Sequence, residues 1–266
     1  MRKLLLFMVV LLLAGCATGP TIDSTHVAKS QDSRVQYLVI HYTALNAERS
    51  LKALAFGGVS SHYLVNDDVE RGWPTIYGLV DEDRRSYHAG ASSWKGNTQL
   101  NASSIGIEIV NLGYQDTPDG RVWFDYPPAQ IDAVIALVKK IVATHNIRPE
   151  RVLAHSDIAP QRKHDPGPRF PWKRLADEGL VQWPDARKVA ERMPAFEHPF
   201  PDMEWFQQNL AQHGFAVPLN GELDEPTRRV IAAFQMKYRP SNFDGMPDAE
   251  TAAMLDVLNS PDRPTR

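Results

Sequence analysis

The stretch Ser104-Ile105-Gly106-Ile107-Glu108-Ile109-Val110 alternates between large apolar residues and smaller or polar ones. Side chains of a β-strand point to alternate faces, so the three isoleucines share one face and Gly106 and Glu108 share the other. An ionised carboxylate in such an apolar strand is costly unless it faces a polar site or has a partner. Glu108 is therefore either a buried structural acid or part of a functional site.

Further strand and helix signals alternate around this stretch. Strand-like runs lie at residues 35–42, 63–65, 76–80 and 151–155. Pro127-Pro128 opens a helix in which apolar residues recur at helical spacing from Ile131 to Val142. We therefore predict an α/β fold over residues 33–190, with a mixed central β-sheet flanked by helices.

Two histidines and one aspartate lie where such segments end. His41 ends the run Val39-Ile40-His41, and His155 follows the run Val152-Leu153-Ala154. Asp165 begins Asp165-Pro166-Gly167-Pro168, a sequence typical of a tight and rigid turn. Two imidazoles and one carboxylate make a three-ligand zinc set with an open fourth position, the form of a catalytic site. Their scattered spacing does not by itself establish a metal site, because each histidine could equally be structural.

Two further residues fit such a site. Beside a zinc-bound water, Glu108 would be a natural general base. Lys163 stands two residues before Asp165 and could reach a developing oxyanion.

The C-terminal part follows a proline-rich and charged stretch and contains a repeat. Gly221-Glu222-Leu223-Asp224-Glu225-Pro226-Thr227 matches Gly245-Met246-Pro247-Asp248-Ala249-Glu250-Thr251 at its Gly, Asp and Thr. Asp caps a helix N-terminus, and Gly permits the turn before it. With a helix around residues 205–213, the repeat predicts a small three-helix domain at residues 198–260, near the lower size limit for a domain. A generic helical bundle with good caps is the alternative to a binding module.

The N-terminus has the pattern of an export signal. Arg2 and Lys3 precede an apolar run from Leu4 to Gly15, which predicts a signal peptide at residues 1–15 and is too short for a membrane span. The run ends Leu13-Ala14-Gly15-Cys16, which resembles the lipobox of bacterial lipoproteins. That resemblance implies acylation of Cys16, a lipid-anchored tether at residues 16–32 and, from Ala17, location at the outer membrane. An ordinary signal peptide with an incidental cysteine is the alternative.

Composition excludes several classes of function. The chain has 266 residues, a net charge of −3 and 23% charged residues, which gives no basic face for nucleic acid. Cys16 is its one cysteine, so the mature protein has no cysteine nucleophile and no thiolate metal site.

Five motifs occur in order between residues 34 and 180. They are Val39-Ile40-His41-Tyr42-Thr43, Ser60-Ser61-His62-Tyr63-Leu64-Val65, Ser86-Tyr87-His88-Ala89-Gly90, Ser104-Ile105-Gly106-Ile107-Glu108 and the run from His155 to Gly167. Together they resemble the zinc N-acetylmuramoyl-L-alanine amidases, a superfamily that includes phage amidase lysozymes and animal peptidoglycan recognition proteins. The most similar group is the outer-membrane lipoprotein amidases of enteric bacteria. The C-terminal repeat resembles the small peptidoglycan-binding domain that accompanies many cell-wall hydrolases.

The resemblance implies a role for each residue that matches. His41, His155 and Asp165 match the family's ligands to one Zn²⁺ ion, Glu108 its catalytic acid/base, and Lys163 its oxyanion-stabilising lysine. His62 is expected to be structural. His88, with Trp94, is a candidate for lining the substrate groove. His164, next to Asp165, complicates the assignment of the metal ligands.

The expected activity is hydrolysis of the amide between the lactyl group of N-acetylmuramic acid, or its anhydro form, and L-alanine of the stem peptide. Peptidoglycan and muropeptides are the expected partners, with membrane attachment through Cys16 on the periplasmic side of the outer membrane. One alternative is a peptidoglycan-binding protein without catalysis, although such relatives lack a metal ligand and this chain has all three. Another is a tether between outer membrane and wall.

Overall fold

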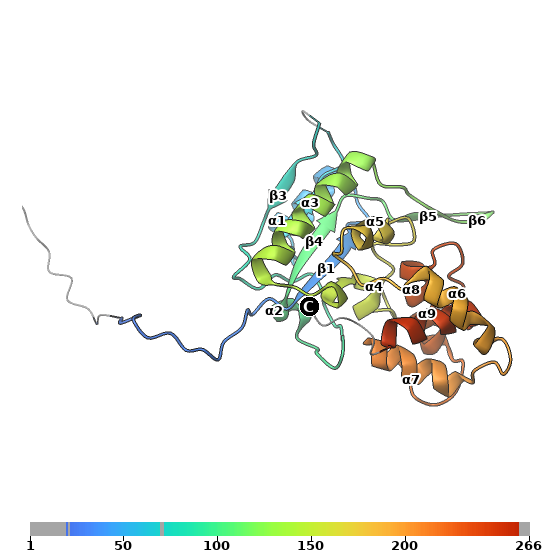
Figure 1. The fold of residues 1–266 in the computed structure, drawn as a ribbon. Coiled ribbons are helices and arrows are strands. Elements are labelled where there is room, and N and C mark those ends of the chain that lie inside the picture. Colours follow the sequence, from blue (N-terminus) through green and yellow to red (C-terminus); the bar gives the residue numbers. More distant parts are fainter. Residues whose placement is uncertain (1–19, 21, 70–71, 261–266) are drawn as a thin grey trace, which may run out of the picture. The chain divides into compact units, whose positions relative to one another are not determined.

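The structure is a computed structural model that describes residue 20 and residues 22–69 and 72–260. A five-stranded sheet with strand order β3-β2-β4-β1-β7 lies at its centre (Figure 1). The strands are β1 (Tyr37–Tyr42), β2 (Tyr63–Val65), β3 (Ile76–Gly78), β4 (Ser104–Ile109) and β7 (Val152–Ala154). Only β3 pairs antiparallel in this sheet, so the predicted mixed sheet flanked by helices is confirmed.

The two central strands explain why the sheet forms where the sequence predicted it. β1 and β4 lie between other strands, and their apolar side chains are buried on both faces, as expected for strands of a parallel sheet. Gly106 of β4 has a specific reason to lack a side chain. A Cβ there would lie 2.6 Å from the ring of His88, so the histidine packs directly on the strand backbone.

Helix α3 (Pro128–His145) covers one face of the sheet. Its buried stripe packs against the side chains of β1 and β4 that point to that face, including Leu38, Ile40 and the three isoleucines of β4. The predicted helix that starts at Pro127-Pro128 is therefore confirmed. The remaining helices before residue 200 are α1 (Ala47–Phe56), α2 (Leu100–Ser103), α4 (His155–Ile158), α5 (Trp172–Asp177) and α6 (Ala186–Arg192), with 3₁₀ turns at Pro149–Arg151 and Met193–Phe196.

The C-terminal helices are α7 (Met203–His213), α8 (Glu225–Tyr238) and α9 (Ala249–Asn259). Asp202, Asp224 and Asp248 cap them, as the repeat predicted for the last two. A glutamine on the preceding helix contacts each repeat. Gln207 accepts from the N–H of Gly221 and donates to Thr227, and Gln235 does the same with Gly245 and Thr251.

The other face of the sheet shares its core with these C-terminal helices. Val39 and Leu153 belong to the same buried cluster as Phe206 and Phe234. The described residues from Ser33 onward form one compact unit. The predicted boundary between residues 190 and 198 stays a prediction. The signal peptide and Cys16 predicted at the N-terminus lie outside the described residues.

Two local differences from the sequence prediction have simple causes. A separate hairpin, β5 (Tyr114–Thr117) and β6 (Gly120–Trp123), was not predicted, because its side chains are mostly polar and exposed. The dipeptide Asp119-Gly120 at its turn was the available signal. The strand predicted at residues 151–155 ends at Ala154, because His155 begins helix α4.

Within the described part of the chain, no helix has the length and apolarity needed to cross a membrane.

Candidate metal centre and active site

Parallel strands bring the predicted site residues to one edge of the sheet. His41 and Glu108 are register partners near the carboxyl ends of β1 and β4. His155 directly follows β7, which pairs with the other side of β1. Carboxyl ends of neighbouring parallel strands meet at one edge, and ligands of open α/β sheets bind there. The topology thus gathers residues that are more than a hundred positions apart.

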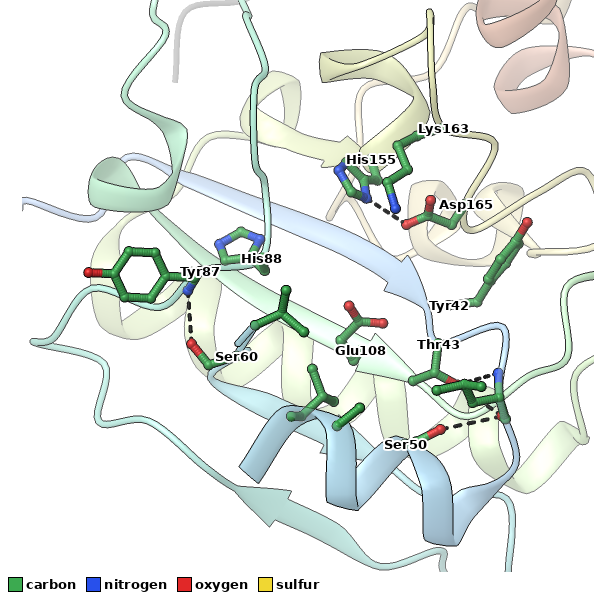
Figure 2. Close-up of a pocket in the computed structure, with 14 residues that line it drawn as sticks. Tyr42, Thr43, Ser50, Ser60, Tyr87, His88, Glu108, His155, Lys163 and Asp165 are labelled. Atoms are coloured by element: carbon green, nitrogen blue, oxygen red, sulfur yellow. Dashed lines mark hydrogen bonds and ion pairs between the residues drawn. The ribbon is translucent and has the colours of Figure 1, made fainter. Parts of the chain in front are cut away.

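Three side-chain atoms, from His41, His155 and Asp165, converge at this edge, and Figure 2 shows two of these side chains, His155 and Asp165, close together. His41 Nδ1 lies 2.8 Å from His155 Nδ1 and 3.1 Å from Asp165 Oδ2, and His155 Nδ1 lies 2.9 Å from Asp165 Oδ2. All three residues are buried. Their ligand atoms all lie within 4.8 Å of one another, which is close enough for the three residues to hold one metal ion.

The hydrogen bonds around His41 assign its tautomer. The Ser104 hydroxyl donates to the carbonyl oxygen of Leu100, so its oxygen is free to accept from His88 Nε2, which lies 3.1 Å away. His88 Nδ1 then accepts from His41 Nε2, at 2.9 Å. A neutral imidazole has one N–H, so His41 Nδ1 carries a lone pair.

The same reasoning applies to His155. Its Nε2 lies 3.2 Å from the carbonyl oxygen of Ala89 and 3.4 Å from Arg162 Nη2, which itself donates to that carbonyl oxygen at the shorter distance of 2.5 Å. We assign the closer contact, in which Nε2 donates to Ala89 and Nδ1 keeps a lone pair. Two nitrogen lone pairs and one carboxylate oxygen therefore face one another within about 3 Å. This arrangement is repulsive unless a cation lies between them, and imidazole and carboxylate are donors that zinc prefers. The residues present fit one metal ion with three protein ligands.

Burial and neighbouring charges tune these groups. Burial, and then the charge of His155, lower the pKa of His41 to about 4, so that it is neutral at pH 7. Burial alone would raise the pKa of Asp165, but the electrostatic effect of the adjacent His155 and His41 outweighs burial in the metal-free protein and holds that pKa well below its usual range. Both protonation states are those that metal binding requires.

Glu108 faces the same space. Burial, and then the negative charge of Asp165, raise the pKa of its carboxyl well above the usual value, and the nearby charge of Lys163 opposes the rise. Oε2 of Glu108 is buried and has no hydrogen-bond partner among the described residues. A half-buried acid with one buried, unpaired oxygen and a raised pKa is typical of a catalytic acid or base.

A cavity of about 200 Å³ connects these groups to solvent. Figure 2 shows Glu108 and Lys163 pointing toward the space next to His155 and Asp165. The residues that line it are Tyr42, Thr43, Leu45, Ser50, Ala53, Leu54, Val59, Ser60, Tyr87, His88, Glu108, His155, Lys163 and Asp165. A second hollow of about 410 Å³ shares Leu54, Val59, Ser60 and Tyr87 with the first, so the groove continues away from the metal centre.

Other predicted residues lie in different places. His88 lines the cavity and also bonds His41, a contact that the sequence did not predict. Trp94 is 2% exposed, packs on His213 and Phe215, and is not among the residues that line the cavity, in contrast to the groove position predicted for it. His62 is buried and accepts from the N–H of Gly106, which agrees with a structural role.

His164 does not join the three converging atoms. Its ring packs edge-on against Tyr114 and Trp123 of the hairpin. Burial and the charge of Arg121 lower its pKa. His164 therefore lies outside the group His41, His155 and Asp165 that could hold a metal ion. The sequence analysis did not predict a role for two residues near the site. Tyr42 lines the cavity, and its position next to His41 was the one available signal. Ser104 contacts His88, but a lone serine in a sequence gives no signal of such a role.

Comparison with known families agrees with this geometry. Residues 31–168 match the family model described as N-acetylmuramoyl-L-alanine amidase, and residues 201–255 match the putative peptidoglycan binding domain. The chain is 45% identical over 262 residues to the N-acetylmuramoyl-L-alanine amidase AmiD of Escherichia coli, covering 93% of this chain and 94% of that protein.

Solved structures give the same result. The chain is similar, with a TM-score of 0.83 and 42% identity, to E. coli AmiD in complex with the substrate anhydro-N-acetylmuramic acid-L-Ala-D-γ-Glu-L-Lys, covering 90% of this chain and 94% of that one. It is also similar to AmpDh3 of Pseudomonas aeruginosa in complex with anhydromuramic pentapeptide. The TM-score is 0.83 at 38% identity, over 90% of this chain and 97% of that one.

Proposed function

The chain belongs to the N-acetylmuramoyl-L-alanine amidase family, and from this premise we propose how its residues hydrolyse the amide between the muramic acid lactyl group and L-alanine. The observation that carries the proposal is the convergence of two imidazole lone pairs and one carboxylate beside Glu108, whose Oε2 is buried without a hydrogen-bond partner among the described residues. Zinc is the ion we propose for His41, His155 and Asp165, since three such ligands with an open fourth position are typical of catalytic zinc. When bound, zinc lowers the pKa of water and polarises a carbonyl group.

Glu108 is the proposed general base and then the general acid. Its raised pKa makes it a stronger proton acceptor than an ordinary glutamate, and its side chain lines the cavity where the attacking water must lie. After accepting the water's proton, the same carboxyl group delivers it to the departing amine of L-alanine. No covalent intermediate forms on the protein, in keeping with a chain whose one cysteine is Cys16.

Lys163 is the proposed oxyanion partner. Its side chain lines the cavity on the side of Asp165, opposite the strand that carries Glu108. A fixed ammonium group there stabilises charge that develops on the lactyl carbonyl oxygen in the transition state. His88 lines the groove and holds His41 in the tautomer that leaves Nδ1 available.

The two similar solved complexes contain anhydromuramic acid peptides, and in the AmiD complex this peptide is the substrate. By that similarity, we propose that this chain also accepts the anhydro form. The C-terminal helices, which match a peptidoglycan-binding family, would hold the enzyme near the wall.

Attachment to the outer membrane through Cys16 is a further part of the proposal. It is supported by the sequence Leu13-Ala14-Gly15-Cys16 and by Ala17 after it. Metabolic labelling with a fatty acid, followed by membrane fractionation of the natural protein and a Cys16→Ser variant, tests it. Unlabelled natural protein in the soluble periplasmic fraction would refute it.

The decisive test of the activity uses a chain that starts at Ala17. Purified muropeptides, with and without the anhydro sugar, are incubated with this chain, with a chelator, and with chelator followed by zinc. Mass spectrometry should detect free peptides that begin with L-alanine, lost with chelator and restored by zinc. Intact muropeptides under all metal conditions would overturn the proposed mechanism.

A further inference from the structure

Helix α8 belongs to the region that matches the peptidoglycan-binding family, yet it touches both segments that carry metal ligands. Figure 1 shows α8 beside α4, the short helix that begins at His155. In addition to a shared apolar core, α8 makes polar contacts with these segments.

The first contact is a buried ion pair. Lys237, near the end of α8, is 4% exposed, and its Nζ lies 2.6 Å from Oδ2 of Asp157, which is 1% exposed. The same ammonium group donates to the carbonyl oxygen of Val152 at 3.3 Å and lies 4.5 Å from the centre of the Trp172 ring. Breaking a buried pair by removing one partner is strongly unfavourable, because the other charge stays buried without compensation.

Asp157 connects this pair to the metal centre. Its Oδ2 also accepts from the backbone N–H of Ala154, at 2.8 Å, and so fixes the turn into which His155 is built. Its other oxygen, Oδ1, is buried without a hydrogen-bond partner among the described residues. Lys237 is therefore the charged group that holds Asp157 in the orientation that caps α4.

The second contact holds the segment of the other ligand. Arg229 Nη1 donates to the carbonyl oxygen of Gln161 at 2.6 Å, and Gln161 Nε2 donates to the carbonyl oxygen of Pro226 at 2.9 Å. Gln161 lies two residues before Lys163 and four before Asp165. The N–H of Ser156 donates to the carbonyl oxygen of Asp165 at 3.0 Å, so the two ligand segments are also tied to each other.

We propose that α8 is a structural part of the metal site, with Lys237 as a positioning residue that acts on His155 through Asp157, and Arg229 as one that acts on Asp165 through Gln161. The C-terminal module then has two roles, to hold the wall and to fix the geometry of the ligands. This inference rests on the proposed metal site. Groups that orient metal ligands from outside typically change metal affinity or activity by about 10- to 100-fold when they are lost.

The test compares variants of the full chain, each titrated with zinc against a chelator of known affinity. Lys237→Met keeps the length of the side chain and removes its charge. We expect zinc to bind about 10- to 100-fold more weakly, kcat to fall and KM to stay within about twofold, while binding to purified sacculi is retained. The visible absorption spectrum of the Co²⁺-loaded variant should also change. If α8 served only to bind the wall, this spectrum would be the same as that of the natural chain.

Two further variants keep the inference testable if Lys237→Met does not fold. The double variant Lys237→Met, Asp157→Asn removes both charges but keeps an acceptor for the N–H of Ala154. It should recover folding and most of the zinc affinity. Arg229→Ala should weaken zinc binding, whereas Arg228→Ala should not, because Arg228 donates to Asp244 within the C-terminal module.

The outcomes separate this inference from the proposed function. If the natural chain binds no zinc, the proposed metal site fails and the inference fails with it. If the natural chain binds zinc and folded Lys237→Met binds it equally well with the same kcat, the role of Lys237 is refuted. Equal zinc affinity of Arg229→Ala and Arg228→Ala would refute the second contact.

Discussion

Replacement of Glu108 by glutamine removes one ionisable group and almost no volume. Because this carboxyl lies beside the ligands but is not among the three converging atoms, the variant should bind one metal ion as the natural chain does. General acid–base catalysis by a positioned group contributes about 10²- to 10⁴-fold to rate, or roughly 3–5 kcal/mol of barrier. We therefore expect kcat on muropeptides to fall by about that factor.

The same substitution should stabilise the metal-free protein at neutral pH. The folded-state pKa of Glu108 is raised above its ordinary value of 4.5, chiefly by burial, so the folded state binds its proton more tightly than the unfolded state does. Stability from this group is fully present below about pH 4.5 and is lost as the pH rises toward the folded pKa. A glutamine side chain cannot lose a proton, so the variant should gain stability over the natural chain as the pH rises through that window.

The assay pairs muropeptide turnover with denaturant unfolding of chelator-treated protein at several pH values. Glu48→Gln, at an exposed position in the first turn of α1, serves as the matched control. Unchanged turnover in Glu108→Gln would show that the strand carboxylate is structural. A variant less stable than the natural chain at neutral pH would refute the argument from burial.

Four other outcomes are expected. His155→Ala should lose both bound metal and activity, and normal metal content by elemental analysis would reject it as a ligand. Lys163→Met should keep its metal and lose about 10²- to 10³-fold in kcat with little change in KM, as for loss of an oxyanion donor; a change in KM alone would contradict this. His41 has a pKa of about 4 in place of 6.5, so the metal-free protein should lose about 3 kcal/mol as the pH falls from 6.5 through 4, and unfolding curves independent of pH in that range would disagree. Trp94→Ala should cost about 3–5 kcal/mol of stability and leave KM of the folded enzyme unchanged, whereas a raised KM would place Trp94 in the groove.

Local patterns were enough to locate most of the fold. The alternation at residues 104–110 predicted a strand with a buried apolar face, and the helical spacing after Pro127-Pro128 predicted a helix with a buried apolar face. In the structure, these apolar residues are buried in β4 and α3. The caps Asp224 and Asp248 were readable for the same reason, since a cap depends on a few adjacent residues. The β5–β6 hairpin was missed because exposed, polar strands lack this periodicity.

The candidate site was readable in part. Its ligand set could be proposed from residue types and from motifs, because imidazole and carboxylate chemistry does not depend on the fold. Trp94 shows the limit of that approach. It stands in the chain just after the motif of His88, but packs on His213 and Phe215 in the core rather than along the groove.

The sequence by itself determined which chemical groups are present and which segments bury an apolar face, since both properties are carried by individual residues and their near neighbours. Tertiary structure alone decided which of nine histidines share a site, which nitrogen of His41 carries the lone pair, and that Lys237 reaches Asp157. These facts depend on the pairing of β1 with β4 and β7 and on the packing of α8 against α4. Such contacts join residues far apart in the chain, and a single sequence contains no local signal for them.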